Sequence, residues 1–309
     1  MRFRRIAAIG AAATAVLATT AAVLPGTPVD TPQPMPALTA KALAARYTTD
    51  SFMIAGAAAT AREAGNTAEA NELDRMSHEH FIDFNSRGAG LAVEVIGNLA
   101  TATRVAILVP GSSTSLATFN TRGTSSPGGG AAALAAEAHR LDPGNHLAII
   151  AWLGYNTPGM LSPAVMTSGD AGQGADALRP FVDYLAHRGK QVALICHSYG
   201  SVVCGLAAPG LPVTDIAVIA SPGMDVSTVR ALHTTARVWA GRGAGDPIQY
   251  VPHIHFLGLG FGQDPMDPAF GARVFAAGSG GHSSYFKPGG IALRNLAYIA
   301  LGDPAAVTR

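Results

Sequence analysis

The sequence predicts an α/β fold, with a mostly parallel sheet of about eight strands covered by helices on both faces, after a short helical N-terminal segment. Three observations predict this class. Apolar stretches typical of buried strands alternate with stretches typical of amphipathic helices. The 309 residues are 48% hydrophobic and 13% charged, which suits a large core. One apolar strand, residues 192–196, runs directly into a turn and a helix of small residues.

Residues 1–26 have the pattern of a signal peptide or an anchor. Arg2, Arg4 and Arg5 precede residues 6–24, which carry no charge and are rich in Ala, Val and Leu. A basic start, an apolar stretch and an exit of small residues favour a cleaved export signal. A retained single-span anchor is the alternative, because the apolar stretch nearly reaches the thickness of a bilayer. Either way, the bulk of the chain is expected to be secreted or held in the cell envelope.

The next segments lead into the main domain, which we expect at residues 79–309. Residues 27–36 are rich in Pro and Thr and indicate an exposed linker. Residues 37–78 show Ala, Leu and Met at helical spacing, without strand-like alternation. Because residues 52–54 (Phe-Met-Ile) are too apolar to leave in solvent, this helical extension is expected to pack on the main domain.

The main domain opens with alternating strands at residues 81–84 and 91–96, joined by a turn at residues 86–90. Further strands are expected at residues 104–109, 146–152, 191–196, 215–220, 236–240 and 273–277. Helices are expected at residues 131–141, 175–188, 199–208, 226–234 and 291–301. The Ser/Thr/Gly-rich residues 112–130 indicate a long functional loop rather than a domain boundary.

Ser198 stands at the turn after the strand at residues 192–196. Residues 196–200 follow the pattern Gly-x-Ser-x-Gly of a nucleophile elbow, except that Cys196 replaces the first glycine. A serine in this turn is lifted clear of the sheet, and the following helix points backbone N–H groups at an anion that forms on it. Gly200 supplies the small residue that the turn needs. The pattern therefore indicates a nucleophilic serine.

Cys196 and Cys204 are the two cysteines of the chain. One lies at the strand end and the other on the second turn of the helix, so their Cβ atoms are expected within bonding reach. An oxidising compartment favours a disulfide that would hold the elbow. The alternative is a pair of small buried thiols.

A nucleophilic serine needs a histidine to take its proton and an acid to orient that histidine. In a parallel sheet these groups gather beyond the carboxyl ends of the strands. Asp246 follows the strand at residues 236–240, and His282 follows the strand at residues 273–277, each in a Gly-rich loop. Ser198, Asp246 and His282 are therefore the expected catalytic residues.

Other acids and histidines have plainer interpretations. Asp264 and Asp267 each precede a proline and are typical turn residues. His197 is expected to point into packing or into the pocket wall. His253 and His255 have the alternating spacing of metal ligands on a strand, but no third ligand accompanies them, so no metal is expected.

Acyl transfer also requires donors for the developing oxyanion. We expect them to be the backbone N–H of Tyr199 and that of Ser112, with Ser113 as the next choice for the second donor. Ser113, Trp152 and Tyr155 are expected to line the substrate pocket. No organic cofactor is expected. The net charge of +1 and the lack of a basic run beyond the leader argue against nucleic-acid binding.

From about Phe81 to its C-terminus, the chain resembles the α/β-hydrolase superfamily, and more narrowly an actinobacterial exported branch catalogued as a domain of unknown function. The matching motifs are residues 109–113, 152–155, 197–201, 221–224, 246–247 and 281–285. The chain order Ser198, Asp246, His282 is also the order of this superfamily. The resemblance implies the α/β-hydrolase fold, the triad and hydrolysis, but it implies no particular substrate.

The expected function is an exported serine hydrolase that cleaves carboxylic esters, with lipid or acyl esters favoured, through an acyl-enzyme. A peptidase or a cell-envelope acyltransferase using the same triad is one alternative. A non-catalytic member that binds a lipid or a partner is another. The expected partner is a small-molecule or lipid ester, and association with a membrane or the cell envelope is left open.

Overall fold

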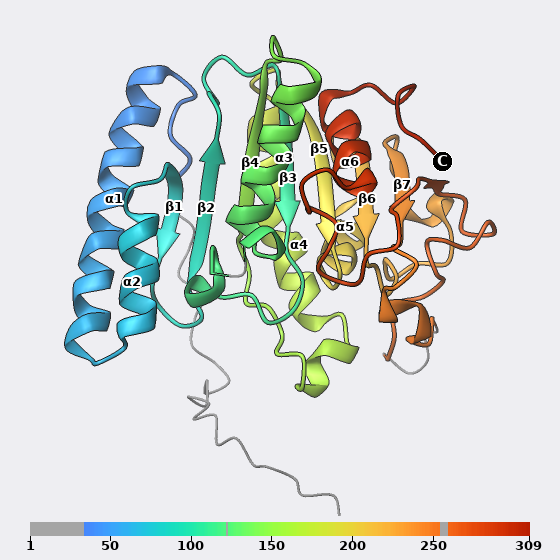
Figure 1. The fold of residues 1–309 in the computed structure, drawn as a ribbon, viewed down its shortest axis with the longest axis horizontal. Helices are drawn as coiled ribbons and strands as arrows, with labels where there is room; N and C mark the ends of the chain where they lie inside the picture. The colour runs from blue at the N-terminus through green and yellow to red at the C-terminus, as the bar shows by residue number, and fades with distance from the viewer. Residues whose placement is uncertain (1–33, 122, 254–258) are drawn as a thin grey trace, which may run out of the picture.

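The computed structural model describes residues 34–121, 123–253 and 259–309. Its strands form one eight-stranded sheet in the order β1-β2-β4-β3-β5-β6-β7-β8 (Figure 1). β2 pairs antiparallel with β1 and with β4, and every other pair is parallel. The predicted mostly parallel sheet is therefore confirmed. The expected leader, most of the linker and His255 lie outside the described residues.

The strands are β1 (Phe81–Asn85), β2 (Leu91–Ile96), β3 (Arg104–Val109), β4 (Leu147–Leu153), β5 (Gln191–His197), β6 (Val213–Ile219), β7 (Arg237–Gly241) and β8 (Arg273–Val274). The helices are α1 (Ala40–Glu63), α2 (Thr67–Met76), α3 (Pro127–Leu141), α4 (Gly169–Ala186), α5 (Gly200–Ala207) and α6 (Ile291–Leu301). The central strands are buried along nearly their whole length because helices cover both faces of the sheet.

Two buried apolar clusters lie on opposite faces of the sheet. α4 and α5 cover one face, where Leu178 and Val203 belong to the same cluster as Cys196. α3 and α6 cover the other face, where Leu134 belongs to the same cluster as Ile195. Successive residues of β5 thus point to opposite layers, as the pleat of a strand requires.

α1 and α2 occupy the expected helical extension and pack beside β1 (Figure 1). Gly65, with φ +80°, makes the turn between the two helices. α2 also reaches the loop that follows β3, because Oε1 of the buried Glu72 accepts a hydrogen bond of 2.8 Å from the backbone N–H of Asn120. The helical extension therefore supports the loop at residues 112–130. No helix in the described part of the chain combines the length and hydropathy of a membrane span.

Two predicted elements differ from the structure. The helix expected at residues 226–234 is only a 3₁₀ turn, Val229–Leu232, which ends where His233 adopts the left-handed φ of 47°. The strand expected at residues 273–277 is shortened to β8, because the N–H of Ala276 bonds instead to the carbonyl of Thr308 in the C-terminal segment.

Candidate active site

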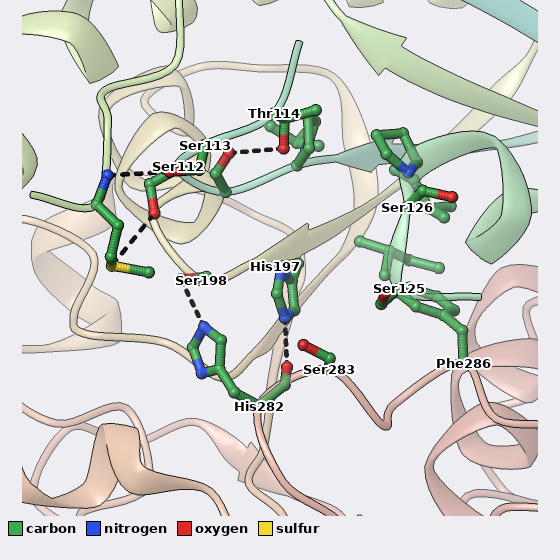
Figure 2. A pocket seen from close by; sticks show the side chains of 17 residues that line it. Ser112, Ser113, Thr114, Ser125, Ser126, His197, Ser198, His282, Ser283 and Phe286 are labelled. Atoms are coloured by element: carbon green, nitrogen blue, oxygen red, sulfur yellow. Dashed lines mark hydrogen bonds between the residues drawn. The ribbon is translucent and has the colours of Figure 1, made fainter. Parts of the chain in front are cut away.

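Ser198, Asp246 and His282 meet beyond the carboxyl ends of β5, β7 and β8. The three strands lie in the parallel part of the sheet, so the loops that follow them share one edge. Nε2 of His282 lies 3.0 Å from Oγ of Ser198 (Figure 2), and its Nδ1 lies 2.9 Å from Oδ1 of Asp246. The structure thus brings the three expected residues into one chain of hydrogen bonds.

The backbone around Ser198 has the strain of a sharp strand-to-helix turn. Ser198 adopts φ +54°, a left-handed conformation that non-glycine residues rarely hold. A Cβ on Gly200 would lie 2.5 Å from the carbonyl oxygen of Val109, and a Cβ on Gly111 would lie 2.7 Å from Cβ of Ser198. Because neither position has room for a Cβ, the end of β3 and the turn that carries Ser198 can approach each other this closely only with glycine at both positions.

Cys196 and Cys204 form a disulfide, with their Cα atoms 6.5 Å apart. Both side chains are fully buried. The bridge joins the end of β5 to α5 across the turn that carries Ser198, which is the pairing expected from the sequence.

Asp246 is completely buried and accepts three hydrogen bonds. Its Oδ1 accepts from the N–H of Ile248 at 2.9 Å as well as from His282, and its Oδ2 accepts from the hydroxyl of Tyr285 at 2.5 Å. Burial acts to raise the pKa of Asp246, but the bonds from His282, Tyr285 and Ile248 outweigh it and hold the pKa below its ordinary value. The carboxylate therefore stays ionised beside the imidazole.

Tyr285 is a site residue to which sequence reasoning assigned no role. Its hydroxyl donates to Asp246 and accepts from the N–H of Gly243 at 3.1 Å. Burial, followed by the bond to Asp246, raises the pKa of Tyr285, so it remains a donor. A buried tyrosine usually finds a partner for its hydroxyl, and its place three residues after His282 was the available signal.

His197 lines the cavity and lies against His282, with the two ring centroids 5.1 Å apart. Its Nε2 lies 2.8 Å from the backbone carbonyl oxygen of His282 (Figure 2). Burial, followed by the nearby His282, lowers the pKa of His197 to about 4. The ring is therefore neutral at pH 7, and because a carbonyl only accepts, Nε2 carries the proton and donates it.

The expected oxyanion donors differ in their hydrogen bonding. Within the described residues, neither the N–H of Ser112 nor that of Tyr199 donates a hydrogen bond. The N–H of Ser113 donates to the carbonyl of Pro158 at 2.9 Å. Ser112 and Tyr199 therefore keep amides available for a ligand, whereas the amide of Ser113 is already occupied.

A cavity of about 350 Å³ opens beside Ser198. Its walls come from the end of β3 and the loop after it, the start of α3, the loop after β4, the end of β5 and the loop that carries His282. Figure 2 shows several of these side chains around Ser198. The lining residues are Leu108, Val109, Pro110, Gly111, Ser112, Ser113, Thr114, Ser125, Ser126, Pro127, Met160, Ile195, His197, Ser198, His282, Ser283 and Phe286. Ser113 is thus in the lining, as expected.

Trp152 and Tyr155 are not among the residues that line this cavity, so that expectation is wrong. Both are buried in the layer of α4 and α5, where their rings stack with centroids 6.1 Å apart. Tyr155 packs against Gly174 of α4 and donates its hydroxyl to the carbonyl of Pro110 at 2.8 Å. From the layer of α4 and α5, Tyr155 therefore supports the loop that follows β3.

Among the described residues, no group of three or more His, Cys, Asp or Glu side chains could hold a metal ion. Nδ1 of His253 bonds to the carbonyl of Pro222 at 3.0 Å, and its Nε2 lies 3.6 Å from Oδ2 of Asp264. Asp264 also pairs with Arg242 at 2.6 Å. His253 is thus part of a polar network with Asp264 and Arg242.

Residues 85–256, more than half of the chain, match the model of a family described as alpha/beta hydrolase. The uncharacterized protein Rv2079 of Mycobacterium tuberculosis strain ATCC 25618 / H37Rv is 33% identical over 260 residues. That alignment covers 71% of this chain and 38% of the relative, so the chain spans well under half the length of the curated protein it matches.

Two solved structures are similar in fold. A dienelactone hydrolase from Anabaena variabilis ATCC 29413 is 17% identical with a TM-score of 0.47, and the match covers 75% of this chain and 98% of that one. An alpha-beta serine hydrolase homologue from Coxiella burnetii is 12% identical with a TM-score of 0.40, and the match covers 73% of this chain and 96% of that one.

Proposed function

The chain belongs to the alpha/beta hydrolase family, and we propose that it is an exported serine hydrolase that cleaves carboxylic esters of lipid or other acyl groups. The observation that carries the proposal is the unbroken chain of hydrogen bonds from Asp246 through His282 to Ser198. Its geometry suits a serine nucleophile, a histidine base and an orienting carboxylate.

In the first half of the reaction, Oγ of Ser198 attacks the carbonyl carbon of the ester. Its proton passes to Nε2 of His282, and the carbonyl oxygen takes up the negative charge. The free amides of Ser112 and Tyr199 would donate to that oxygen. When the intermediate collapses, the bond to the alcohol oxygen breaks, and the imidazolium returns its proton to the departing alcohol. The acyl group stays on Ser198.

In the second half, a water molecule takes the place of the alcohol. His282 removes its proton, the oxygen bonds to the acyl carbon, and the intermediate collapses to release a carboxylic acid and regenerate Ser198. Asp246 remains ionised throughout, because its three donors favour the carboxylate. It fixes the tautomer of His282 that leaves Nε2 ready to accept a proton.

Export is part of the proposal. The disulfide between Cys196 and Cys204 supports it, because such bonds persist chiefly in oxidising compartments outside the cytoplasm. The basic and apolar pattern of residues 1–26 agrees with this location. Sequencing the N-terminus of the protein recovered from the culture medium and from the cell envelope would test it. Recovery of the intact chain in the cytoplasm alone would overturn the export proposal.

The direct test of the proposed reaction is labelling with a fluorophosphonate probe, which reacts with activated serines. We expect the wild-type protein to be labelled and Ser198→Ala to be unlabelled while its circular dichroism spectrum is unchanged. Absence of labelling across pH 5 to 9 would favour a non-catalytic binding protein. Labelling accompanied by amide cleavage, or by acyl transfer to an alcohol without net hydrolysis, would instead favour a peptidase or an acyltransferase.

A further inference from the structure

Exposed apolar side chains gather in the segment between β4 and α4. Leu161 is 100% exposed, Met160 is 54% exposed and Met166 is 43% exposed. No Asp, Glu, Lys or Arg occurs in the sequence from residue 154 to residue 169. A single exposed apolar side chain is ordinary on a protein surface, but three in one short uncharged segment point to a contact surface. We call Met160, Leu161 and Met166 the apolar rim.

The apolar rim begins in the wall of the cavity beside Ser198. Met160 is one of the lining residues, and its Sδ lies 3.9 Å from Oγ of Ser112, a contact that Figure 2 draws beside Ser112. Leu161 follows Met160 directly and is not part of the lining. An apolar surface therefore runs from the wall of the cavity at Met160 to the outside of the protein at Leu161.

Hydrogen bonds hold the segment that carries the apolar rim. The N–H of Met160 donates to Oγ of Ser113 at 3.0 Å, and the N–H of Ser113 donates to the carbonyl of Pro158 at 2.9 Å. Beyond Met166, the carbonyl of Thr167 accepts from the hydroxyl of Tyr199 at 2.6 Å. Figure 1 shows this light-green segment extending past the carboxyl ends of the parallel strands. The protein thus presents the apolar rim in a fixed place, which lowers the ordering cost of contact with a ligand.

The cavity has room for only part of a lipid ester. Its volume of about 350 Å³ stands near the lower limit of the roughly 300–1,000 Å³ typical of ligand sites. Leu108, Ile195 and Phe286 are buried in one core cluster, so the cavity cannot extend past them without rearrangement of the core. Met160 is the apolar lining residue that is exposed. An apolar substrate longer than the cavity therefore leaves it over Met160.

We propose that the apolar rim docks on the surface of aggregated, uncharged lipid, such as an ester droplet or a bilayer, and that the ester enters the cavity past Met160. An uncharged segment gains from burying apolar area rather than from attraction to charged headgroups. A protein partner seated on the apolar rim would instead cover the mouth of the cavity at Met160. The inference rests on the function proposed above and adds the physical state of the substrate, which is aggregated rather than dissolved.

Hydrolysis of glyceryl tributyrate, measured below and above its solubility limit, tests the proposal on the full chain. The wild-type rate should rise steeply once the ester forms droplets. Leu161→Ser should lower the rate on droplets about tenfold, and the rate on the dissolved ester by clearly less. Phe52→Ser removes a side chain that is 75% exposed on α1, and is the matched control that should change neither rate. A wild-type rate that levels off below the solubility limit, or equal losses in the Leu161 and Phe52 variants, would overturn the proposal.

Flotation with vesicles of palmitoyl-oleoyl-phosphatidylcholine tests docking without hydrolysis. The protein is Ser198→Ala, alone or with Leu161→Ser or Phe52→Ser added. Because an apolar leader could bind lipid on its own, all variants are compared in the same full-length background. We expect Leu161→Ser to weaken binding about tenfold, Phe52→Ser to leave it unchanged, and added salt to have no effect.

Three results of the flotation experiment would overturn the docking surface. They are equal binding of all variants, binding that requires anionic lipid, and a dimer that depends on Leu161 in the absence of vesicle binding, which would favour a second copy of the chain. Fluorophosphonate labelling of the same chains with Ser198 intact reports the nucleophile separately. Vesicle binding without labelling would therefore refute the proposed reaction, whereas labelling without vesicle binding would refute the docking surface alone.

Discussion

The imidazole of His197 donates a hydrogen bond of 2.8 Å to the backbone carbonyl of His282. The strand end that precedes the candidate nucleophile thereby holds the loop that carries the candidate base. Since the two histidines come from segments 85 residues apart in sequence, this contact is a direct link between β5 and the loop after β8. We therefore expect His197 to position His282 through this bond.

The first prediction concerns this link. His197→Leu should lower kcat more than it changes KM, by about tenfold to a hundredfold, because small displacements of a catalytic group slow proton transfer. His197→Gln, which can place a donor near the same carbonyl, should recover most of the loss. Steady-state kinetics on one ester would measure both variants. Equal activity of the Leu and Gln variants would show that donation to His282 is unimportant.

The second prediction concerns Tyr285 and acid stability. The pKa of Asp246 is below its ordinary value, so the carboxylate contributes stability above its unfolded pKa, and this stability is lost as the pH falls through the folded pKa. Tyr285→Phe removes one donor and should move that pKa upward. We expect acid unfolding, followed by circular dichroism, to begin at higher pH, and the free energy of unfolding at pH 7 to fall by about 1–3 kcal/mol. Tyr298→Phe, in α6, is a control for loss of a tyrosine hydroxyl. An unchanged acid transition in Tyr285→Phe would contradict this role.

The third prediction concerns Glu94 on β2, whose Oε2 is buried without a hydrogen-bonding partner in the described structure. Burial, followed by Glu79 and Glu72, raises the pKa of Glu94 to about 7. A raised carboxyl pKa means that the folded state binds more protons, so stability falls as the pH rises from about 4.5 to about 7.

Glu94→Gln should remove that part of the pH dependence and raise the free energy of unfolding at pH 8 by about 1–3 kcal/mol. Urea denaturation at pH 5 and at pH 8 would measure it. If the free energy of unfolding changed equally with pH in the wild type and the variant, this would contradict a raised pKa of Glu94.

The fourth prediction concerns the disulfide. Closing a loop between residues eight apart in sequence should stabilise the protein by about 2–3 kcal/mol through the entropy of the unfolded chain. The double variant Cys196→Ala/Cys204→Ala should therefore melt at a lower temperature while keeping its fluorophosphonate labelling at 15 °C. Thiol titration of the unfolded wild-type protein without reductant should find no free thiol. Two free thiols would contradict the bridge.

Much of the fold was predictable because its central strands are apolar along almost their whole length. Residues 192–196 could be recognised as a buried strand, and the abrupt change to small and polar residues located the turn at Ser198. The expected helix at residues 226–234 was wrong because local apolar spacing does not reveal the left-handed backbone at His233, which ends the short 3₁₀ turn.

The location of a site residue could be predicted when it depends on which strand the residue follows. It could not be predicted when it depends on which face of the sheet the side chain points to. Asp246 and His282 follow parallel strands, so the topology alone brings them to the same edge of the sheet as Ser198. Trp152 is the penultimate residue of β4, but its side chain points into the layer of α4. His197 could have been placed by strand alternation, because Cys196 faces α5 and the next residue must face the opposite layer.

The most direct test of the account is the site and rate of covalent modification by a fluorophosphonate, followed by intact mass and peptide mapping. We expect one adduct per chain, on Ser198, and a rate of adduct formation that falls by about a hundredfold or more in His282→Ala. An adduct on another residue, or an equal rate of modification of Ser198 in His282→Ala, would contradict activation of Ser198 by His282.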